Sequence, residues 1–328
     1  MIRRIQIFST DCTNPHRNLA VEQYLLETVP EETCILYLWQ NRRTVVIGCN
    51  QSPWKECRTA ALEADGGFLA RRLSGGGAVF HDLGNLNFTF LVNKADYDLP
   101  RQLGVIVEAC RLLGIPAECS GRNDVLSNGR KFSGNAFYEH GGKSYHHGTL
   151  LVNVDLSSMG RYLSPSKAKL EAKGVESVRS RVVNLKELRP DLTIAAMAEQ
   201  MEEAFQRVYG LKAERLSEQA FDTRRIEALA ERNAGWDWLY GRDLPVSLEC
   251  EGRYAWGEIC LRLSAEEGKI REVRVYTDAM DWQLAPALEK ALTGCRLRLE
   301  DIRARVRAAG LEERTSEDLC GLLDQMDI

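Results

Sequence analysis

The sequence predicts an α+β protein with a large N-terminal domain and a small α+β C-terminal domain. Helical and strand-like patterns alternate in mixed runs, which favours α+β over a regular strand–helix–strand winding. The 328 residues are enough for one large and one small domain. An aromatic segment at residues 236–241, followed by Pro245, marks a boundary. We therefore expect domains at 1–244 and 245–328.

Composition narrows the function classes. The formal net charge is −4, from 43 basic and 47 acidic residues, so the chain lacks the basic excess typical of nucleic-acid binders. No stretch approaches the roughly 18 apolar residues of a membrane span, and the N-terminus has no uninterrupted apolar signal segment. The ten cysteines form no CxxC pair. We expect a cytoplasmic protein with free thiols, and neither nucleic acid nor membrane as a partner.

The first elements follow from periodicity. Apolar positions from Asn18 to Thr28 repeat at helical spacing and predict an amphipathic helix. Strand-like runs follow at Cys34–Trp39 and Thr44–Gly48, and the polar turn between them, residues 40–43, predicts a hairpin. Ser52 and Pro53 fit the N-cap and the first position of a helix that continues to about Ala64.

The middle of the chain is rich in strands. Glycines at 66–67 end the preceding helix, and strands are expected at Phe68–Leu73, Ala78–His81 and Leu86–Val92. A helix near Leu103–Leu113 ends at the Gly114-Ile115-Pro116 stop. Two further strands, Lys131–Glu139 and Tyr145–Val154, flank a Gly141-Gly142 turn.

Helical patterns at Ile194–Tyr209 and Arg224–Arg232 lead to the aromatic boundary segment. Beyond it, we expect strands at Arg253–Leu263 and Ile270–Thr277, followed by helices at Ala285–Thr293 and Leu299–Ala309.

The densest motif is the run from Arg71 to Asp82, which combines two arginines, a serine and three glycines. Glycines let backbone amides approach an anion, and arginine offers a planar fork for phosphate or carboxylate oxygens. Side chains alternate along a strand, so only one of Arg71 and Arg72 is expected to face a ligand. The run is neither a Walker loop nor a GxGxxG fingerprint. The alternative is a glycine-rich bend beside two solvated arginines.

A second polar constellation comprises residues 121–124, 129–136 and 145–151. Lys131 opens a strand beside small residues, where its ammonium can reach a pocket and stabilise charge on a carboxylate or an α-phosphate. The alternative for Lys131 is a solvated charge at a strand end. For His146 and His147 there are two alternatives: a hydrogen bond in the core or a role as a general base.

At these motifs the chain resembles the lipoate–protein ligase family, of the A type with a C-terminal accessory domain. The matching runs occur in the family's order: RRLSGGGAVFHDLGNLNFTF at 71–90, SGRNDV at 120–125, RKFSGNA at 130–136, HHGTLL at 146–151 and KLEAKGVESVRSRVVNL at 169–185. The resemblance covers about residues 1–190, and the tail from Trp236 to Arg307 is similar to the family's accessory domain.

The resemblance implies a biotin/lipoate ligase-like large domain with a mixed sheet and flanking helices. It implies that lipoic acid and ATP, with Mg²⁺, form lipoyl-AMP and pyrophosphate, without a tightly bound prosthetic group. The lipoyl group then passes to a lysine of an acceptor. The implied acceptors are apo lipoyl domains of 2-oxoacid dehydrogenase acyltransferase subunits and the glycine-cleavage H protein.

Roles carry over by motif position. Lys131 matches the catalytic lysine that contacts lipoate and nucleotide, and the ATP-binding stretch corresponds to Arg72, Gly77, Ala78, Val79 and Phe80. Asn123 and Asp124 match a segment near the nucleotide, with Asp124 a candidate Mg²⁺ ligand. Further pocket candidates are Ser74, Gly75, Gly76, His81 and His147. The chain departs from many relatives at Cys49-Asn50-Gln51, where they carry an arginine.

Three alternatives stand beside ligation. An octanoyl or lipoyl transferase on the same scaffold uses no ATP and commonly passes the acyl group through a cysteine thioester, for which Cys49 and Cys57 are available. Biotin ligation and a non-catalytic sensor of lipoate are the others.

Overall fold

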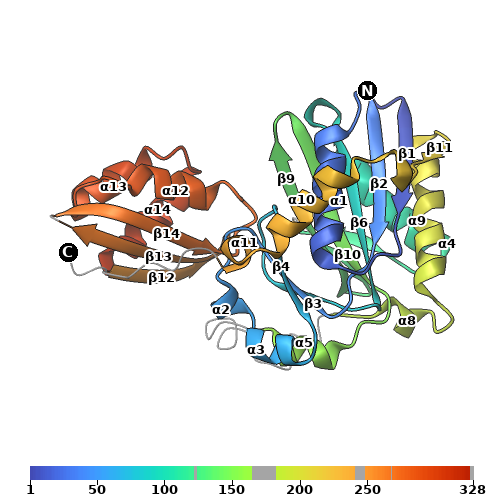
Figure 1. Cartoon of the computed structure of the whole chain (residues 1–328), viewed down its shortest axis with the longest axis horizontal. Coiled ribbons are helices and arrows are strands. Elements are labelled where there is room, and N and C mark those ends of the chain that lie inside the picture. Colours follow the sequence, from blue (N-terminus) through green and yellow to red (C-terminus); the bar gives the residue numbers. More distant parts are fainter. Residues whose placement is uncertain (122–123, 165–181, 241–247, 267, 326–328) are drawn as a thin grey trace.

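The computed structural model describes the chain except for residues 122–123, 165–181, 241–247, 267 and 326–328. A larger body extends to Tyr240, and a smaller body begins at Leu248 and lies at one side of it (Figure 1).

The larger body is built on an eight-stranded sheet with the order β11-β1-β2-β6-β10-β9-β8-β7. β1 pairs in parallel with β2 and β11, whereas the other neighbours are antiparallel. The strands are β1 Arg4–Ser9, β2 Thr33–Trp39, β6 Asn85–Asn93, β7 Glu118–Ser120, β8 Asp124–Ser127, β9 Arg130–His140, β10 Lys143–Leu151 and β11 Ala213–Arg215. The mixed sheet expected from the resemblance is confirmed.

Helices cover both faces of this sheet, which explains why every residue of β2 is buried. Leu36 points to one face and packs in a cluster with residues of α4 Leu99–Leu112 and α9 Ile194–Tyr209. Its neighbour Tyr37 points to the other face, toward α1 Pro15–Thr28 and α10 Thr223–Ala234. Because side chains alternate along a strand, the apolar residues of β2 contribute to a hydrophobic core on each face of the sheet.

A separate three-stranded sheet carries the glycine-rich run. It has the order β4-β3-β5, with β3 at Thr44–Ile47, β4 at Phe68–Arg71 and β5 at Val79–His81. The predicted hairpin between Cys34–Trp39 and Thr44–Gly48 is wrong, because β2 pairs with β1 and β6 while β3 pairs with β4 and β5. Distant segments occupy both edges of each strand, so the local turn signal does not decide the pairing.

The helix expected from Pro53 to about Ala64 is divided into α2 Pro53–Glu56 and α3 Thr59–Ala64. Cys57 between them is extended and forms a bridge with Leu163, and the Arg58 amide donates to the Tyr162 carbonyl. The other helices in the described part of this body are η1 Lys94–Asp96, α5 Leu156–Tyr162, α8 Leu185–Leu188, η2 Glu218–Ala220 and α11 Trp236–Tyr240.

The smaller body is an antiparallel sheet with helices packed on it, which confirms the expected small α+β domain. Its elements are β12 Leu248–Tyr254, β13 Gly257–Glu266, β14 Lys269–Thr277, α12 Leu284–Leu292, α13 Leu299–Arg307, α14 Glu313–Leu322 and η3 Leu323–Gln325. Its apolar side chains form their own core. The strand expected at Arg253–Leu263 spans the turn between β12 and β13. The expected boundary after residue 244 lies outside the described residues and stays a prediction.

In the part of the chain that the structure describes, none of the helices combines the length and the apolar character needed to cross a membrane.

Candidate active site

A cavity of about 220 Å³ is lined by residues of the main sheet and of the glycine-rich run. Eight of the predicted site residues line it: Arg72, Gly76, Gly77, Ala78, Val79, His81, Lys131 and His147. Ser74 and Gly75 lie behind this lining, and Phe80 packs into a hydrophobic cluster instead. Asn123 falls outside the described residues. The two motif groups that were separate in sequence therefore meet around one cavity.

The two arginines of the motif face different surroundings. Arg72 lines the cavity, whereas Arg71 donates to backbone carbonyls, among them those of Gln51 at 2.7 Å and Trp238 at 2.8 Å. Arg71 thereby fixes α11 to the segment that follows β3. Only Arg72 of the two lines the cavity, and the expectation that one arginine alone faces a ligand stays a prediction. The alternative of two solvated arginines is wrong because both are buried.

Arg72 holds the glycine-rich loop in shape. Its Nη2 donates to the carbonyls of Gly75 at 2.7 Å and Gly77 at 2.8 Å, and its Nη1 donates to the Val46 carbonyl. Burial lowers the pKa of Arg72. The guanidinium fork is here turned to loop carbonyls, so contact with phosphate stays a prediction.

The smaller body touches this loop directly. The Gly76 amide donates to the Ala279 carbonyl at 2.9 Å, and Met280 lines the cavity. A Cβ at Gly75 would lie 2.6 Å from the Ala279 carbonyl oxygen, so only glycine fits there without displacing the smaller body. Asn50, in the segment that departs from the family pattern, also joins the two bodies, since its side chain donates to the Trp282 carbonyl at 2.9 Å.

Lys131 lies at the start of β9 and lines the cavity, as its motif predicts. Its Nζ is 2.6 Å from Asp124 Oδ1, and both side chains are about one-third exposed. A Cβ at Gly134 would lie 3.0 Å from the lysine Cε and Nζ, so this glycine leaves room for the ammonium. The lysine is thus not only a solvated strand-end charge but a cation at the edge of a cavity.

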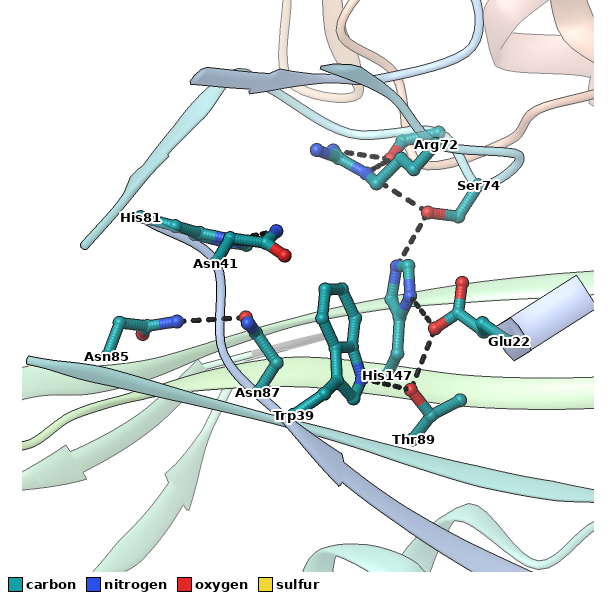
Figure 2. A network of polar contacts seen from close by, with 11 residues as sticks. Glu22, Trp39, Asn41, Arg72, Ser74, His81, Asn85, Asn87, Thr89 and His147 are labelled. Atoms are coloured by element: carbon teal, nitrogen blue, oxygen red, sulfur yellow. Dashed lines mark hydrogen bonds and ion pairs between the residues drawn. The ribbon is translucent and has the colours of Figure 1, made fainter. Parts of the chain in front are cut away.

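A buried polar line leads away from Arg72 (Figure 2). Arg72 Nε donates to Ser74 Oγ at 3.1 Å, Ser74 Oγ lies 2.8 Å from His147 Nε2, and His147 Nδ1 lies 2.8 Å from Glu22 Oε1. Thr89 Oγ1 also donates to Glu22 Oε1 at 2.7 Å. Ser74 is fully buried, so this line orients His147 and Arg72 and does not expose a nucleophilic hydroxyl.

His146 lies away from the cavity in the main core. Its Nε2 is 2.8 Å from Asn135 Oδ1 and its Nδ1 is 3.2 Å from Gln102 Oε1, and burial lowers its pKa to about 3. For His146 the core hydrogen bond, rather than general-base chemistry, is the reading that fits.

Neither cysteine considered for a thioester has the setting of a reactive thiol. Burial raises the pKa of Cys49 to about 11 and that of Cys57 to about 12, and neither lines the cavity. A nucleophilic cysteine requires a lowered pKa and access. All ten cysteines carry free thiols.

Several cavity residues escaped the sequence reasoning. Trp39 and Asn87 line the cavity, and Glu22 orients His147 from within α1. Glu22 had a usable signal, because a carboxylate on the apolar face of an amphipathic helix needs a buried partner. Met280 had none, since nothing local in its sequence places it against a loop two hundred residues earlier.

Two family models match the chain. The model described as the lipoyl protein ligase A/B catalytic domain matches residues 14–206, and that of the bacterial lipoate protein ligase C-terminus matches residues 245–323. The two matched ranges fall on the larger and the smaller body.

Relatives named lipoate-protein ligase A match nearly the whole chain. The Psychrobacter cryohalolentis protein is 41% identical and the Bdellovibrio bacteriovorus protein 40% identical, each covering 92% of this chain and 91% of its own length.

Solved structures agree in fold. P. falciparum LipL1 in complex with lipoate has a TM-score of 0.87 at 26% identity and covers 98% of this chain and 99% of its own. A lipoate-protein ligase A bound with ATP has a TM-score of 0.61 at 25% identity, covering 74% of this chain and 99% of its own. With both domains matched and the motif residues gathered at one cavity, the chain belongs to the lipoate–protein ligase family.

Proposed function

We propose that the chain activates lipoic acid with ATP, forming lipoyl-AMP and pyrophosphate, and transfers the lipoyl group to a lysine of an apo lipoyl domain. The observation that carries the proposal is the cavity in which Lys131 faces the glycine-rich run. Its setting in a family whose members are ligases of this type supports the same reaction.

In the first step a lipoate oxygen attacks the α-phosphorus of ATP and pyrophosphate leaves. Negative charge grows on the phosphoryl oxygens, and a fixed cation stabilises it more strongly in a water-poor site than in bulk water. Lys131, which lines the cavity, supplies that cation. In this proposal the same ammonium also pairs with the carboxylate of the acid. Backbone amides of the glycine-rich run donate hydrogen bonds to the phosphate oxygens, because no glycine side chain blocks their approach.

In the second step the amine of the acceptor lysine attacks the acyl carbon and AMP leaves. The attacking amine must be neutral, since an ammonium has no lone pair to donate. No further ATP is consumed, so one activation supports one transfer.

Mg²⁺ accompanies ATP as part of the substrate. Magnesium in nucleotide sites is held by one or two carboxylates together with phosphate oxygens, and Asp124 offers one carboxylate beside Lys131. Asp124 is therefore the proposed protein ligand.

The proposed acceptors are apo lipoyl domains of 2-oxoacid dehydrogenase acyltransferase subunits and the glycine-cleavage H protein, and the proposed compartment is the cytoplasm. An archaeal relative supports the first class: a bi-partite ligase from Thermoplasma acidophilum is described together with its E2 lipoyl domain, at 26% identity and a TM-score of 0.63. A carrier-dependent transferase is not favoured, because the half-buried Cys49 and the buried Cys57 both have thiols of raised pKa and the relatives are named ligases.

The test is lipoate-dependent release of pyrophosphate from ATP, with and without an apo lipoyl domain whose mass is then measured. Release together with a lipoyl adduct is the expected result. Release without the adduct would contradict the transfer step, and acyl transfer in the absence of ATP would restore the transferase.

A further inference from the structure

His81 lines the cavity, yet its Nε2 has no hydrogen-bond partner among the described residues. The ring is 96% buried, with a relative exposure of 4%. Leaving a buried polar atom unpaired costs about 1–3 kcal/mol, so such an atom on a cavity wall points to a ligand. If Nε2 carries a proton it binds an acceptor atom, and if it does not it binds a donor.

Hydrogen bonds through two asparagines, Asn18 and Asn41, decide which nitrogen of His81 carries the proton; we call these two residues the Asn18–Asn41 relay. Asn18 Nδ2 lies 2.9 Å from the Cys12 carbonyl and 2.8 Å from the Gln40 carbonyl, and backbone carbonyls accept only. The nitrogen end of the Asn18 amide is thereby fixed as a donor. Its two hydrogens are shared with a third acceptor, Asn41 Oδ1 at 3.0 Å. Two amide NH₂ groups facing each other would repel, so this atom is the acceptor end of the second amide.

The other end of Asn41 is then Nδ2, which lies 3.2 Å from His81 Nδ1 (Figure 2). An amide nitrogen only donates, so His81 Nδ1 must accept and cannot carry a proton. In a neutral imidazole the proton must therefore be on Nε2. Asn18 and Asn41 are fully buried, so water does not compete for these contacts.

The ring stays neutral for a physical reason. Burial, reinforced by the positive charge of the nearby Arg72, lowers the pKa of His81 to about 3. A neutral ring with Nδ1 accepting carries its proton on Nε2, so a residue that lines the cavity holds an N–H donor with no protein partner among the described residues.

A second buried polar atom belongs to the same place. Asn87, on β6 beside β10, lines the cavity and is 1% exposed. Its Oδ1 accepts from Asn85 Nδ2 at 2.8 Å, and its Nδ2 has no partner among the described residues. Figure 2 places Asn87 on the same side of Trp39 as His81, away from Ser74 and Glu22.

From this geometry we propose that His81, held as the Nε2–H tautomer by the Asn18–Asn41 relay, donates a hydrogen bond to an acceptor atom of the bound acyl-adenylate, with Asn87 as the second donor. The proposal rests on the proposed function for the identity of the ligand. The acceptor comes either from the acyl carboxyl group or from the nucleotide. His81 and Asn87 are then ligand-contacting residues, and Asn18 and Asn41 are positioning residues.

Two substitutions of His81 separate the donor from its support. His81→Asn keeps an acceptor near the Nδ1 position and so keeps the contact with Asn41, but it removes the donor. His81→Gln reaches further and returns an amide N–H near the Nε2 position. We expect His81→Asn to weaken binding of the contacted ligand by roughly ten-fold and His81→Gln to restore most of it.

The acid and the nucleotide are tested separately by calorimetric titration with lipoate and with an ATP analogue that resists cleavage between the α- and β-phosphorus. A loss confined to lipoate assigns the acceptor to the carboxyl group, and a loss confined to the analogue assigns it to the nucleotide. Unchanged affinity for both ligands in His81→Asn overturns the proposal.

The tautomer is read directly in the full chain by ¹⁵N spectroscopy of labelled histidine rings, with the His81 signals assigned by their loss in His81→Asn. We expect a neutral Nε2–H ring at pH 7 whose Nε2 resonance moves on saturation with one of the two ligands. Asn41→Leu, which lies outside the cavity lining, should mix the two tautomers and weaken binding in parallel. An Nδ1–H ring, an imidazolium, or resonances that neither ligand moves would overturn the proposal.

These readouts need no turnover. A chain that binds lipoate through His81 but releases no pyrophosphate would refute the proposed ligation and leave this inference standing. A chain that releases pyrophosphate with an unmoved His81 would do the reverse.

Discussion

The backbone amide of Gly76 donates a 2.9 Å hydrogen bond to the carbonyl of Ala279, and it joins the glycine-rich loop to the smaller body. One amide of the loop proposed to bind phosphate is therefore already occupied by a protein carbonyl. The loop and the smaller body are coupled, and a change at one side of this contact should be felt at the other.

Gly75→Ala should loosen that contact. Its new Cβ would lie 2.6 Å from the Ala279 carbonyl oxygen and 2.8 Å from that of Met280, so the smaller body must shift. We expect hydrogen exchange at the amide of residue 76 to become roughly ten-fold faster or more, because opening then costs less free energy. Gly77→Ala is the matched control, since a Cβ there meets nothing within 4 Å. Equal exchange in the two variants would contradict the close fit at Gly75.

The two neighbouring arginines should fail in different ways when changed to lysine. Arg71→Lys removes several hydrogen bonds to buried carbonyls and should lower the free energy of unfolding by about 2–4 kcal/mol. Arg72→Lys should lower stability as well and should in addition weaken ATP use, because an ammonium cannot hold the carbonyls of Gly75 and Gly77 with one planar fork. Urea unfolding and steady-state kinetics in ATP distinguish them, and normal ATP kinetics in Arg72→Lys would count against its role.

Lys131→Ala should abolish lipoate-dependent pyrophosphate release while leaving the fold intact. Its ion pair with Asp124 is about one-third exposed on both sides, so its loss should cost less than about 1 kcal/mol of stability. Lys94→Ala is a suitable control, since it removes another partly exposed lysine whose ammonium pairs with Glu139 outside the cavity. A folded Lys131→Ala chain that releases pyrophosphate at a near-normal rate would refute the proposed role.

Stability should fall between pH 7 and pH 5. Burial lowers the pKa of His81 and of His146 to about 3, whereas an exposed histidine titrates near 6.5. The unfolded chain therefore binds more protons below that value, so each ring's contribution is present above about pH 6.5 and is lost as pH falls, by up to about 1.4 kcal/mol per pH unit. Urea unfolding across this range measures the slope. The slope should be shallower in His81→Asn, and an unchanged slope would argue against a neutral buried ring.

Cys49→Ser with Cys57→Ser should leave ATP-dependent ligation active, and iodoacetamide should inhibit the unmodified chain slowly at neutral pH. Cys57 is buried, Cys49 is half-buried, and both thiols have raised pKa values, so little reactive thiolate is present. Intact mass after timed alkylation reports the reaction. Rapid loss of activity with modification at Cys49 would return a thiol to the mechanism.

Much of the architecture followed from local patterns. Helices such as Ile194–Tyr209 carry a strong amphipathic period and ended where expected, because the same residues that set the period also form the core. The short strands β7, β8 and β11 escaped notice, since segments of three or four residues carry too little period to stand out. The pairing of β2 with β6 was likewise invisible, because partner choice is settled by segments far apart in sequence.

The site divided in the same way. The glycine-rich run and Lys131 were predicted from sequence because glycines, arginines and a lysine grouped in this way are typical of anion binding. Glu22, Asn87 and Met280 were not predicted, because no local sequence pattern marks them. Each reaches the site only through the packing of strands, helices and the smaller body. The hydrogen bonds from Asn18 through Asn41 to His81 likewise could not be predicted, because they form only in the folded chain.

The contact between Gly76 and Ala279 has a consequence for assembly. Because both residues belong to one chain, they meet at an effective concentration in the millimolar range, roughly that of modules joined by a short linker. A weak contact is then enough to keep the smaller body on the loop. The contact can open without the two bodies separating, because they remain covalently connected. If the two bodies were separate chains, their association would instead depend on the concentration of each and on their mutual affinity.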